Sequence, residues 1–454
     1  MPPERLNWRE PAAIMKASWN SAVPSLLEQV FVVATALIFW TDSLALAFPG
    51  ELDAPSFVFR TTVLGIYGIV LVLLARRPVV FRRALVVSPA LMALLFMPAL
   101  SAIWSIEPDV TLHRSFALLG SSMFGVYLAT HLPLTRTLFL LGIAGTLAAL
   151  ISLILIGAVP RIGIMQGGEY LGVWRGAYHH KNAFGQMTAL GAIVCWLALQ
   201  NTHGSGAFVF GAGLAMNLLL LAGSKSFTAQ FLFIVCAVVL FSAGAFVRGL
   251  VNNFLVLLPF LAIASIGATI AISGYDVASL LFSLGKDATL SARVPMWQEI
   301  MPFANDRFWL GYGYEVFWRA GHYPIDIITQ RIRFNPVYAH NGLLELWLGL
   351  GITGVAIFCA AFAQFIVYAG AMLYRAPKHP IYLLSVVFIV MTVLQNVSEV
   401  TLLQRNSMSW ILFVMLSVVL ATRFHGFNVG ATTDDEPGTR LPQVASTQPK
   451  LLVV

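Results

Sequence analysis

Apolar runs about as long as a lipid bilayer is thick recur along this chain. Of its 454 residues, 58% are hydrophobic and only 10% are charged, whereas soluble domains carry about 25% charged residues. A membrane-spanning helix needs about 20 mostly apolar residues, and the sequence offers many such runs. One soluble core cannot bury so much apolar surface. We therefore expect an all-α integral membrane protein whose solvent is the bilayer.

Charged residues, prolines and glycines divide the apolar runs into twelve predicted membrane helices. We expect these helices at 26–47, 57–75, 85–104, 111–130, 137–159, 183–200, 207–223, 227–247, 251–273, 342–373, 381–399 and 407–423. The resulting segments are 1–25 (a cytoplasmic N-terminal segment), 26–273 (helices one to nine), 274–341 (a large outer loop), 342–423 (helices ten to twelve) and 424–454 (a polar cytoplasmic tail predicted to be disordered).

The lysines and arginines of the short loops predict which side each loop faces. The N-terminal segment and the second connection, "RRPVVFRR", are basic, whereas "PGELDAPS" and "SIEPDV" carry acids and no base. Both termini are therefore expected in the cytoplasm. Three segments on the opposite side, 160–182, 222–227 and 274–341, are nevertheless basic. Because outward positive charge opposes the usual insertion bias, we expect these segments to bind an anion.

The ionisable residues of the predicted helices lie near helix ends, and most of them lie near the outer end. Asp42, Arg60, Arg114, Glu345 and Glu399 all have outer positions. A proton- or ion-coupled transporter would place ionisable groups near the bilayer midplane, where this sequence has almost none. The three cysteines fall within apolar runs and no metal-binding motif occurs, so we expect neither a disulfide framework nor a metal cofactor.

Three predicted helices begin on the outer side, each behind a basic or imidazole group. Lys181 and Asn182 lead the sixth helix, Lys225 leads the eighth, and His340 with Asn341 leads the tenth. A helix N-terminus offers unpaired N–H donors and about half a positive charge, which favours anions. Together the three starts would suit a diphosphate whose lipid tail stays in the bilayer. The alternatives are that Lys181 is an interfacial anchor and Lys225 an ordinary turn residue.

The segment "RGAYHHKNAFGQ", 175–186, concentrates ionisable side chains between two apolar runs. Arg175 and His180 join Lys181 and Asn182 there as candidate ligands of the diphosphate. The alternative for Arg175 is an ion pair with Glu169 of the same loop. Adjacent histidines are usually polar loop residues, so at most one of the pair is expected in a site.

The large outer loop contains a predicted helix and an aromatic segment. "LSARVPMWQEIMPFAND" has apolar residues at helical spacing and an early proline, which predicts an amphipathic helix lying on the membrane. Arg293 of this stretch is placed to reach the anion site; its alternative role is that of a snorkelling interfacial arginine. "RFWLGYGYEVFW" follows, and its aromatic side chains suit either sugar faces or the membrane interface.

His340 in "VYAHNGLLELW" stands at a predicted helix start, in front of the expected anion site. A neutral imidazole there can act as a general base at neutral pH. The alternative is a histidine that only caps the helix. Glu345 lies one turn after Asn341 and is placed to orient a neighbouring side chain.

Five motifs occur in a fixed order: "RGAYHHKNAFGQ", "GSKS", "SARVPMW", "GYGYEVFW" and "AHNGLLELWLGLGITG". In kind and order they resemble those of the bacterial O-antigen ligase and polysaccharide polymerase superfamily, over about residues 160–360. The resemblance implies a GT-C-type glycosyltransferase of the bacterial inner membrane, with its active site facing the periplasm. Such enzymes transfer a glycan from undecaprenyl diphosphate to an acceptor without a metal or another cofactor.

The resemblance also implies roles for particular residues. His340 matches the family's acceptor-activating histidine, and Arg293 matches a basic position in the large periplasmic loop. Arg175 and Lys181 match the "RG…HKN" segment. Lys225 falls where many members have arginine, which keeps the charge and loses the bidentate fork. The implied partners are the lipid-linked donor, a glycan acceptor, the bilayer, and a chain-length regulator or flippase of the same pathway; no nucleic acid is expected.

The "HHKN" segment and the compact loop around it resemble exopolysaccharide polymerases more than lipopolysaccharide ligases. We therefore expect an enzyme that polymerises undecaprenyl-diphosphate-linked repeat units in exopolysaccharide or O-antigen biosynthesis. The alternative within the family is ligation of a finished glycan to lipid A core. A transporter or flippase of lipid-linked sugars, from a different class, would need a polar midplane and often internal repeats, and the sequence shows neither.

Overall fold

The computed structural model describes residues 24–50, 56–167, 170–246, 289–319, 324–332 and 336–426. Within these ranges the chain is helical, and its single β-bridge joins Ile164 to Trp174. The elements are α2 Leu26–Trp40, α3 Ser43–Ala47, α4 Phe57–Ala75, α5 Pro78–Val86, α6 Pro89–Leu100, η1 Ser101–Ile103, α7 Pro108–His131, α8 Leu134–Ala158, α9 Pro160–Gly163, α10 Lys181–Gln200, α11 Ser205–Gly223, α12 Phe227–Phe246, α15 Thr289–Asp306, α16 Ile325–Ile332, α17 Gly342–Arg375, α18 Pro380–Ser398 and α19 Met408–Phe424. The predicted all-α class is confirmed for the described ranges.

Six of these helices are long and apolar enough to cross a membrane: α4, α8, α10, α11, α17 and α18. The α5 helix and the α6–η1 stretch meet at a bend of 92° and together would make a seventh, broken span. Shorter apolar helices are α2, α19 and the Phe227–Ser242 part of α12. These helices support a multi-pass membrane protein. The total of twelve spans stays a prediction, because six or seven candidate spans are found among the described residues. The helix expected at 251–273 and the tail from residue 427 lie outside the described residues.

Local backbone chemistry divides three of the predicted spans. The first, 26–47, breaks at Thr41, whose backbone is extended between α2 and α3. Pro89 starts α6 after the bend that follows α5, because proline cannot continue the preceding helix. Within α17, Gly351 has a φ of 69°, and a side chain there would collide with the backbone of Trp309. The long helix is therefore kinked where the outer loop packs against it.

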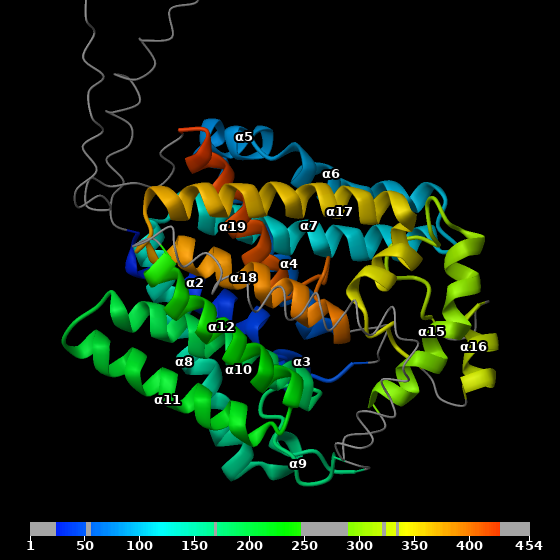
Figure 1. Cartoon of the computed structure of the whole chain (residues 1–454), viewed down its shortest axis with the longest axis horizontal. Coiled ribbons are helices and arrows are strands. Elements are labelled where there is room, and N and C mark those ends of the chain that lie inside the picture. Colours follow the sequence, from blue (N-terminus) through cyan, green and yellow to red (C-terminus); the bar gives the residue numbers. More distant parts are fainter. Residues whose placement is uncertain are drawn as a thin grey trace, which may run out of the picture.

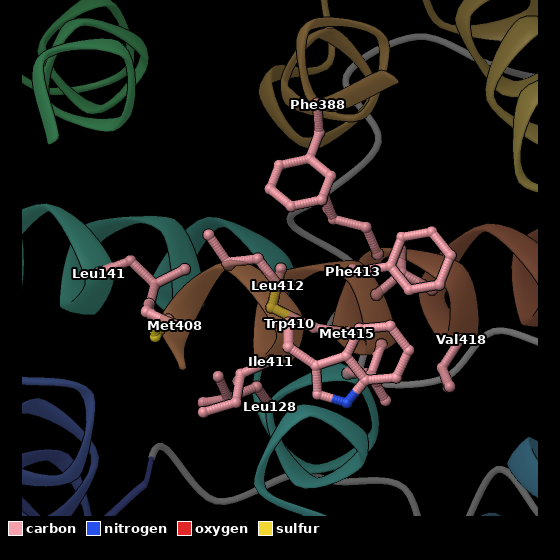
Figure 2. Packing of buried hydrophobic residues seen from close by; sticks show 14 of the residues in the cluster. Leu128, Leu141, Phe388, Met408, Trp410, Ile411, Leu412, Phe413, Met415 and Val418 are labelled. Atoms are coloured by element: carbon pink, nitrogen blue, oxygen red, sulfur yellow. The ribbon is translucent and has the colours of Figure 1, made fainter. Parts of the chain in front are cut away.

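The apolar core is centred on α19. Every residue from Met408 to Thr422 is buried, as expected for a helix that is apolar on all sides, and α7 and α17 pack against it. In Figure 2 the ring of Phe388 of α18 lies above α19, and the indole of Trp410 lies on the lower side of α19, near Leu128 of α7. The indole N–H of Trp410 donates to Ser122 Oγ at 2.9 Å, so its polar atom is satisfied inside the core.

The described part of the outer loop forms a small packed unit at one end of the bundle. The predicted amphipathic stretch is helical and belongs to α15, and Figure 1 shows α15 and α16 together beside the beginning of α17. Met296 of α15 and Ile328 of α16 are buried with Tyr312 and Phe317 of the aromatic segment. This apolar cluster holds the helix that carries Arg293 against the end of the bundle.

Candidate functional site

Four side chains from distant parts of the chain converge on the carboxylate of Glu399. Asn182 Nδ2 donates to Oε1 at 2.9 Å, and Arg293 Nη2 lies 3.3 Å from the same oxygen. Tyr338 Oη donates to Oε2 at 3.3 Å, and His340 Nδ1 lies 3.5 Å from it. Arg293 Nη2 is also 3.4 Å from His340 Nδ1. We call these five residues the Glu399 cluster.

Close packing of two helix ends brings Glu399 and His340 together. The α18 helix ends directly before Glu399, and Asn341 caps the first turn of α17. A side chain at Gly342 would collide with Asn396 of α18, so the glycine permits the close approach of the two ends. Asn341 caps α17 and thereby positions the histidine that precedes it.

The beginnings of α10 and α12 belong to the same hydrogen-bonded layer. His180 is the N-cap of α10, and its Nδ1 accepts from the backbone N–H of Asn182 at 3.3 Å. Ser226, which stands directly before α12, donates through Oγ to Asn182 Oδ1 at 3.2 Å. Asp42 Oδ2 accepts from the backbone N–H of His179 at 3.0 Å, which ties the loop before α10 to the end of α2.

Two of the predicted site residues have a left-handed backbone. Lys225 has a φ of 47° and His340 a φ of 50°, a region that side chains other than glycine seldom adopt. Such conformations persist only where the surroundings enforce them, and they are common at functional sites. At His340 the enforcing contacts include the ring of Tyr338, whose centroid lies 4.2 Å from that of the imidazole.

Glu345 fixes the backbone immediately before His340. Its Oε2 accepts from the backbone N–H of Ala339 at 2.7 Å, and both oxygens accept from Trp318 Nε1, at 2.8 and 2.9 Å. The carboxylate therefore joins the first turn of α17 to the aromatic segment of the outer loop. This contact agrees with the orienting role predicted for Glu345.

The charges of the Glu399 cluster are largely shielded from solvent. The side chains of Arg293 and Glu399 are 11% and 12% exposed. Burial raises the pKa of Glu399, but the hydrogen bond and charge of His340, with the charge of Arg293, outweigh it and bring the pKa below its ordinary value. Burial lowers the pKa of His180, and the nearby Lys181 charge adds to the shift, so the His180 imidazole is neutral at neutral pH.

The predicted lysines lie beside the Glu399 cluster. Lys181 is the first residue of α10, and its Nζ is 4.3 Å from the centre of the Tyr170 ring, a cation–π distance. Lys225 is exposed in the turn before α12, next to Ser226. Because Ser226 bonds Asn182, and Asn182 bonds Glu399, the structure brings Lys181, Lys225, Arg293 and His340 to the same end of the bundle.

Arg175 is placed differently. Its Nε donates to the carbonyl of Ile162 at 2.7 Å, and its two terminal nitrogens donate to the carbonyls of Arg161 and His179, at 3.2 and 3.4 Å. The guanidinium thus links backbone segments of its own loop. Glu169, its alternative partner, lies outside the described residues.

A second group of charged residues surrounds Glu315 in the outer loop. Arg405 Nε donates to Glu315 Oε2 at 2.7 Å, and Tyr314 Oη donates to Oε1 at 3.0 Å. Arg114 donates to the backbone carbonyl of Glu315. We call these four residues the Glu315 cluster. Arg114, predicted as a supporting residue, thus lies in this cluster.

A cavity of about 560 Å³ lies between the two clusters. Its walls include Tyr338, Glu399 and His180 on one side and Arg114, Arg405, Glu315 and Glu345 on the other. Ile38, Phe39 and Trp40 of α2 form part of its apolar wall. The structure therefore offers a partly open pocket that touches both charged groups and apolar residues of α2.

Glu399 and Arg405 were not singled out as site residues by the sequence. Glu399 is 59 positions after His340, and a lone carboxylate at a helix end has no local motif. Arg405 lies in a short loop between two apolar helices, where a basic residue is common. The one available signal was that Glu399 lies at an outer helix end, as Asp42 and Glu345 do.

The family model described as O-Antigen ligase matches residues 190–359. This stretch of the chain is therefore similar to the O-antigen ligase family. The match supports the O-antigen ligase and polymerase superfamily, which the five motifs resemble, and members of this superfamily are glycosyltransferase-like enzymes that act on lipid-linked glycans at a membrane. The matched range contains Lys225, Arg293 and His340, and it ends before Glu399. No curated protein matches the chain.

Proposed function

We propose that this protein polymerises undecaprenyl-diphosphate-linked oligosaccharide repeat units at the periplasmic face of the bacterial inner membrane. The observation that carries the proposal is the meeting of Arg293, His340 and Glu399 at the end of the bundle where α10, α12 and α17 begin. A GT-C-type arrangement of twelve spans with both termini in the cytoplasm is part of the proposal. We also propose that other proteins of the pathway supply the substrate.

The proposed reaction moves a glycan from the lipid diphosphate to an acceptor hydroxyl. The acceptor oxygen bonds to the anomeric carbon while the bond between that carbon and the diphosphate oxygen breaks. The electron pair leaves with the undecaprenyl diphosphate, and His340 takes the proton of the hydroxyl. Attack from the side opposite the leaving group inverts the anomeric centre.

Positive charge beside His340 stabilises the leaving diphosphate. Arg293, Lys181 and Lys225 are its proposed ligands, with His180 and Asn182 at the start of α10. Preorganised cations of this kind often lower a barrier by several kcal/mol. Arg175 contributes indirectly in this scheme, because its guanidinium holds the loop that precedes Lys181.

Glu399 balances the charge that develops on the base. When His340 takes a proton, an imidazolium forms 3.5 Å from the Glu399 carboxylate. A base oriented and balanced by a third group is the recurring arrangement of activated nucleophiles. Since Nδ1 faces Glu399 and Arg293, the proposal assigns the acceptor proton to Nε2.

The leaving group is proposed to be neutralised by arginine and lysine, without a metal ion. Within the described ranges no three His, Cys, Asp or Glu side chains form a group able to hold a metal. The test is reconstitution of the purified protein with a synthetic polyprenyl-diphosphate oligosaccharide, with and without EDTA. We expect longer carrier-linked glycans in both samples. Products that disappear with EDTA would contradict the metal-free scheme.

Ligation of a finished glycan is the second candidate, favoured by the match of residues 190–359 to an O-antigen ligase family. The same layer of residues would serve it, because only the acceptor differs. Product analysis separates the two reactions: carrier-linked polymer of increasing length indicates a polymerase, and glycosylated lipid A core indicates a ligase.

A further inference from the structure

The cavity between the two clusters has a different character from the proposed diphosphate site. Of the proposed diphosphate ligands, His180 lines it, whereas Arg293, Lys181, Lys225 and Asn182, like the base His340, are not among the described residues of its wall. Its volume of about 560 Å³ lies within the range of about 300–1,000 Å³ typical of ligand sites. The cavity and the cationic residues meet at Glu399 and Tyr338, which bond each other and also belong to the cavity wall.

The charges on the cavity wall nearly cancel. Four acidic side chains line it, namely Asp42, Glu315, Glu345 and Glu399, and three arginines, namely Arg114, Arg319 and Arg405. Each arginine already has a partner. Arg405 forms an ion pair with Glu315, and Arg114 donates to the backbone carbonyl of Glu315. Arg319 forms an ion pair with Glu107. A dianion would meet carboxylates without a surplus of cations to compensate them. Hydroxyl groups, which donate to carboxylates and accept from guanidinium groups, suit such a wall.

One buried polar group on this wall lacks a partner. Gln186 of α10 lines the cavity and is 5% exposed, and its Nε2 has no hydrogen-bond partner. It lies one helical turn after Asn182, hence just below the Glu399 cluster. Buried amide groups are nearly always hydrogen-bonded, so a molecule inside the cavity is expected to accept from this amide.

We propose that the cavity binds the acceptor glycan through an uncharged sugar residue, and that Gln186 is a specificity residue that donates to one of its hydroxyls. The apolar wall formed by Phe39, Trp40 and Leu346 then faces the C–H surface of the ring. Glu399 and Tyr338 at the shared wall place the reacting hydroxyl near His340. This inference rests on the proposed transferase function and names the chemistry of its acceptor.

The test separates acceptor binding from donor binding. Full-length protein in lipid nanodiscs is supplied with a polyprenyl-diphosphate repeat unit as donor and with the free repeat-unit oligosaccharide, prepared from the polymer of cells that express the protein, as acceptor. Gln186→Leu is expected to raise the KM for the acceptor by about tenfold, the usual effect of one lost hydrogen bond to a buried group. The KM for the donor is expected to stay unchanged.

Two further variants test whether misfolding explains the effect of Gln186→Leu. Gln186→Glu keeps the size of the side chain and removes the N–H donor, so it is also expected to weaken binding of the acceptor and raise its KM. Gln395→Leu is the matched control, because Gln395 is a buried amide of α18 whose Nε2 also lacks a partner but which is not part of the cavity wall. It is expected to leave the acceptor KM unchanged.

Direct binding of the oligosaccharide, measured by saturation-transfer NMR without donor, distinguishes the two proposals. Binding that depends on Gln186, without bond formation in the complete reaction, would support this inference and contradict the proposed function. Oxidation of the primary hydroxyls of the same oligosaccharide to carboxylates is expected to weaken binding. An acceptor KM unaffected by both Gln186 variants, or tighter binding of the oxidised sugar, would overturn the inference and leave a cavity that only holds water.

Discussion

The Glu399 and Glu315 clusters are built from the same kinds of side chain and differ in what they leave available. Each centres on one carboxylate that accepts from a tyrosine and an arginine. The contacts of Glu315 are shorter, 2.7 Å to Arg405 and 3.0 Å to Tyr314, against 3.3 Å to both Arg293 and Tyr338 at Glu399. Only the Glu399 cluster also contains an imidazole.

This difference separates a structural ion pair from a candidate reaction centre. The Glu315 cluster ties the outer loop to the segment between α18 and α19, and burial raises the pKa of its Tyr314, so the phenol stays protonated. The Glu399 cluster adds His340 and lies beside exposed Lys225. We expect the longer contact of Arg293 with Glu399 to let the guanidinium reach a substrate group, while His340 stays beside Glu399.

The largest expected effect is that of removing the imidazole. His340→Ala should lower the rate of glycan transfer by about 10²- to 10⁴-fold, the usual contribution of a general base. The measurement is the initial rate of glycan elongation in nanodiscs, with the thermal midpoint as a check on folding. His113→Ala is the matched control, because His113 is an exposed histidine of α7 whose Nδ1 contacts only a backbone carbonyl of its own helix. Wild-type polymer length and yield from His340→Ala would assign the residue a structural role.

The same substitution at Glu399 and at Glu315 tests whether the two clusters have different roles. Glu399→Gln should slow transfer by about tenfold or more, because a neutral amide cannot balance an imidazolium. Glu315→Gln removes the partner of Arg405 and should lower the thermal midpoint by a few °C, while the transfer rate at saturating acceptor changes little. Both proteins are measured for elongation rate and for thermal midpoint. The opposite pattern, with slow transfer from Glu315→Gln alone, would exchange the roles given to the clusters.

A smaller effect is expected from the exposed lysine. Lys225→Ala should raise the KM for the lipid-linked donor by about three- to fivefold, since an exposed charge contributes up to about 1 kcal/mol. Lys225→Arg keeps the charge and should restore most of the affinity. The donor is titrated at low and high salt, and the difference between variants should shrink as salt screens the charge. If the KM for the donor is unchanged by both substitutions, Lys225 does not bind the diphosphate.

The smallest expected effect concerns pH and stability. The folded-state pKa of Glu399 lies below its ordinary value of 4.5, so the folded protein holds this proton less tightly than the unfolded chain does. The stabilisation is complete above the ordinary value and is lost as the pH falls through the lowered one. The difference in thermal midpoint between wild type and Glu399→Gln should therefore be largest at neutral pH and narrow toward pH 3. A difference in thermal midpoint that widens on acidification would show that folding raises the pKa of Glu399 instead of lowering it.

Much of the fold follows from hydrophobic runs and from local backbone rules. Of the twelve expected spans, eleven correspond to described helices or helix pairs, because apolar length and glycine or proline breaks are local signals. The 92° bend between α5 and α6 was not expected. Nor was the kink at Gly351, which depends on the approach of Trp309 from a distant loop.

The site was predictable where a residue stands at a helix start and unpredictable where contacts are non-local. Lys181, Lys225 and His340 were predicted from helix starts, and they lie at or just before the starts of α10, α12 and α17, whereas their roles stay predictions. Glu399 was missed because its importance comes from the packing of α18 against α17, which no spacing encodes. Arg175 lies in a charged segment typical of an anion-binding site, yet its guanidinium donates to backbone carbonyls of its own loop.

The most direct test is an experimental structure of the protein in nanodiscs with undecaprenyl diphosphate bound. We expect the diphosphate to lie against Arg293, Lys181 and Lys225, with its terminal phosphate facing His340 and Glu399. A diphosphate bound instead between Arg114 and Arg405, with the Glu399 cluster unchanged, would contradict it.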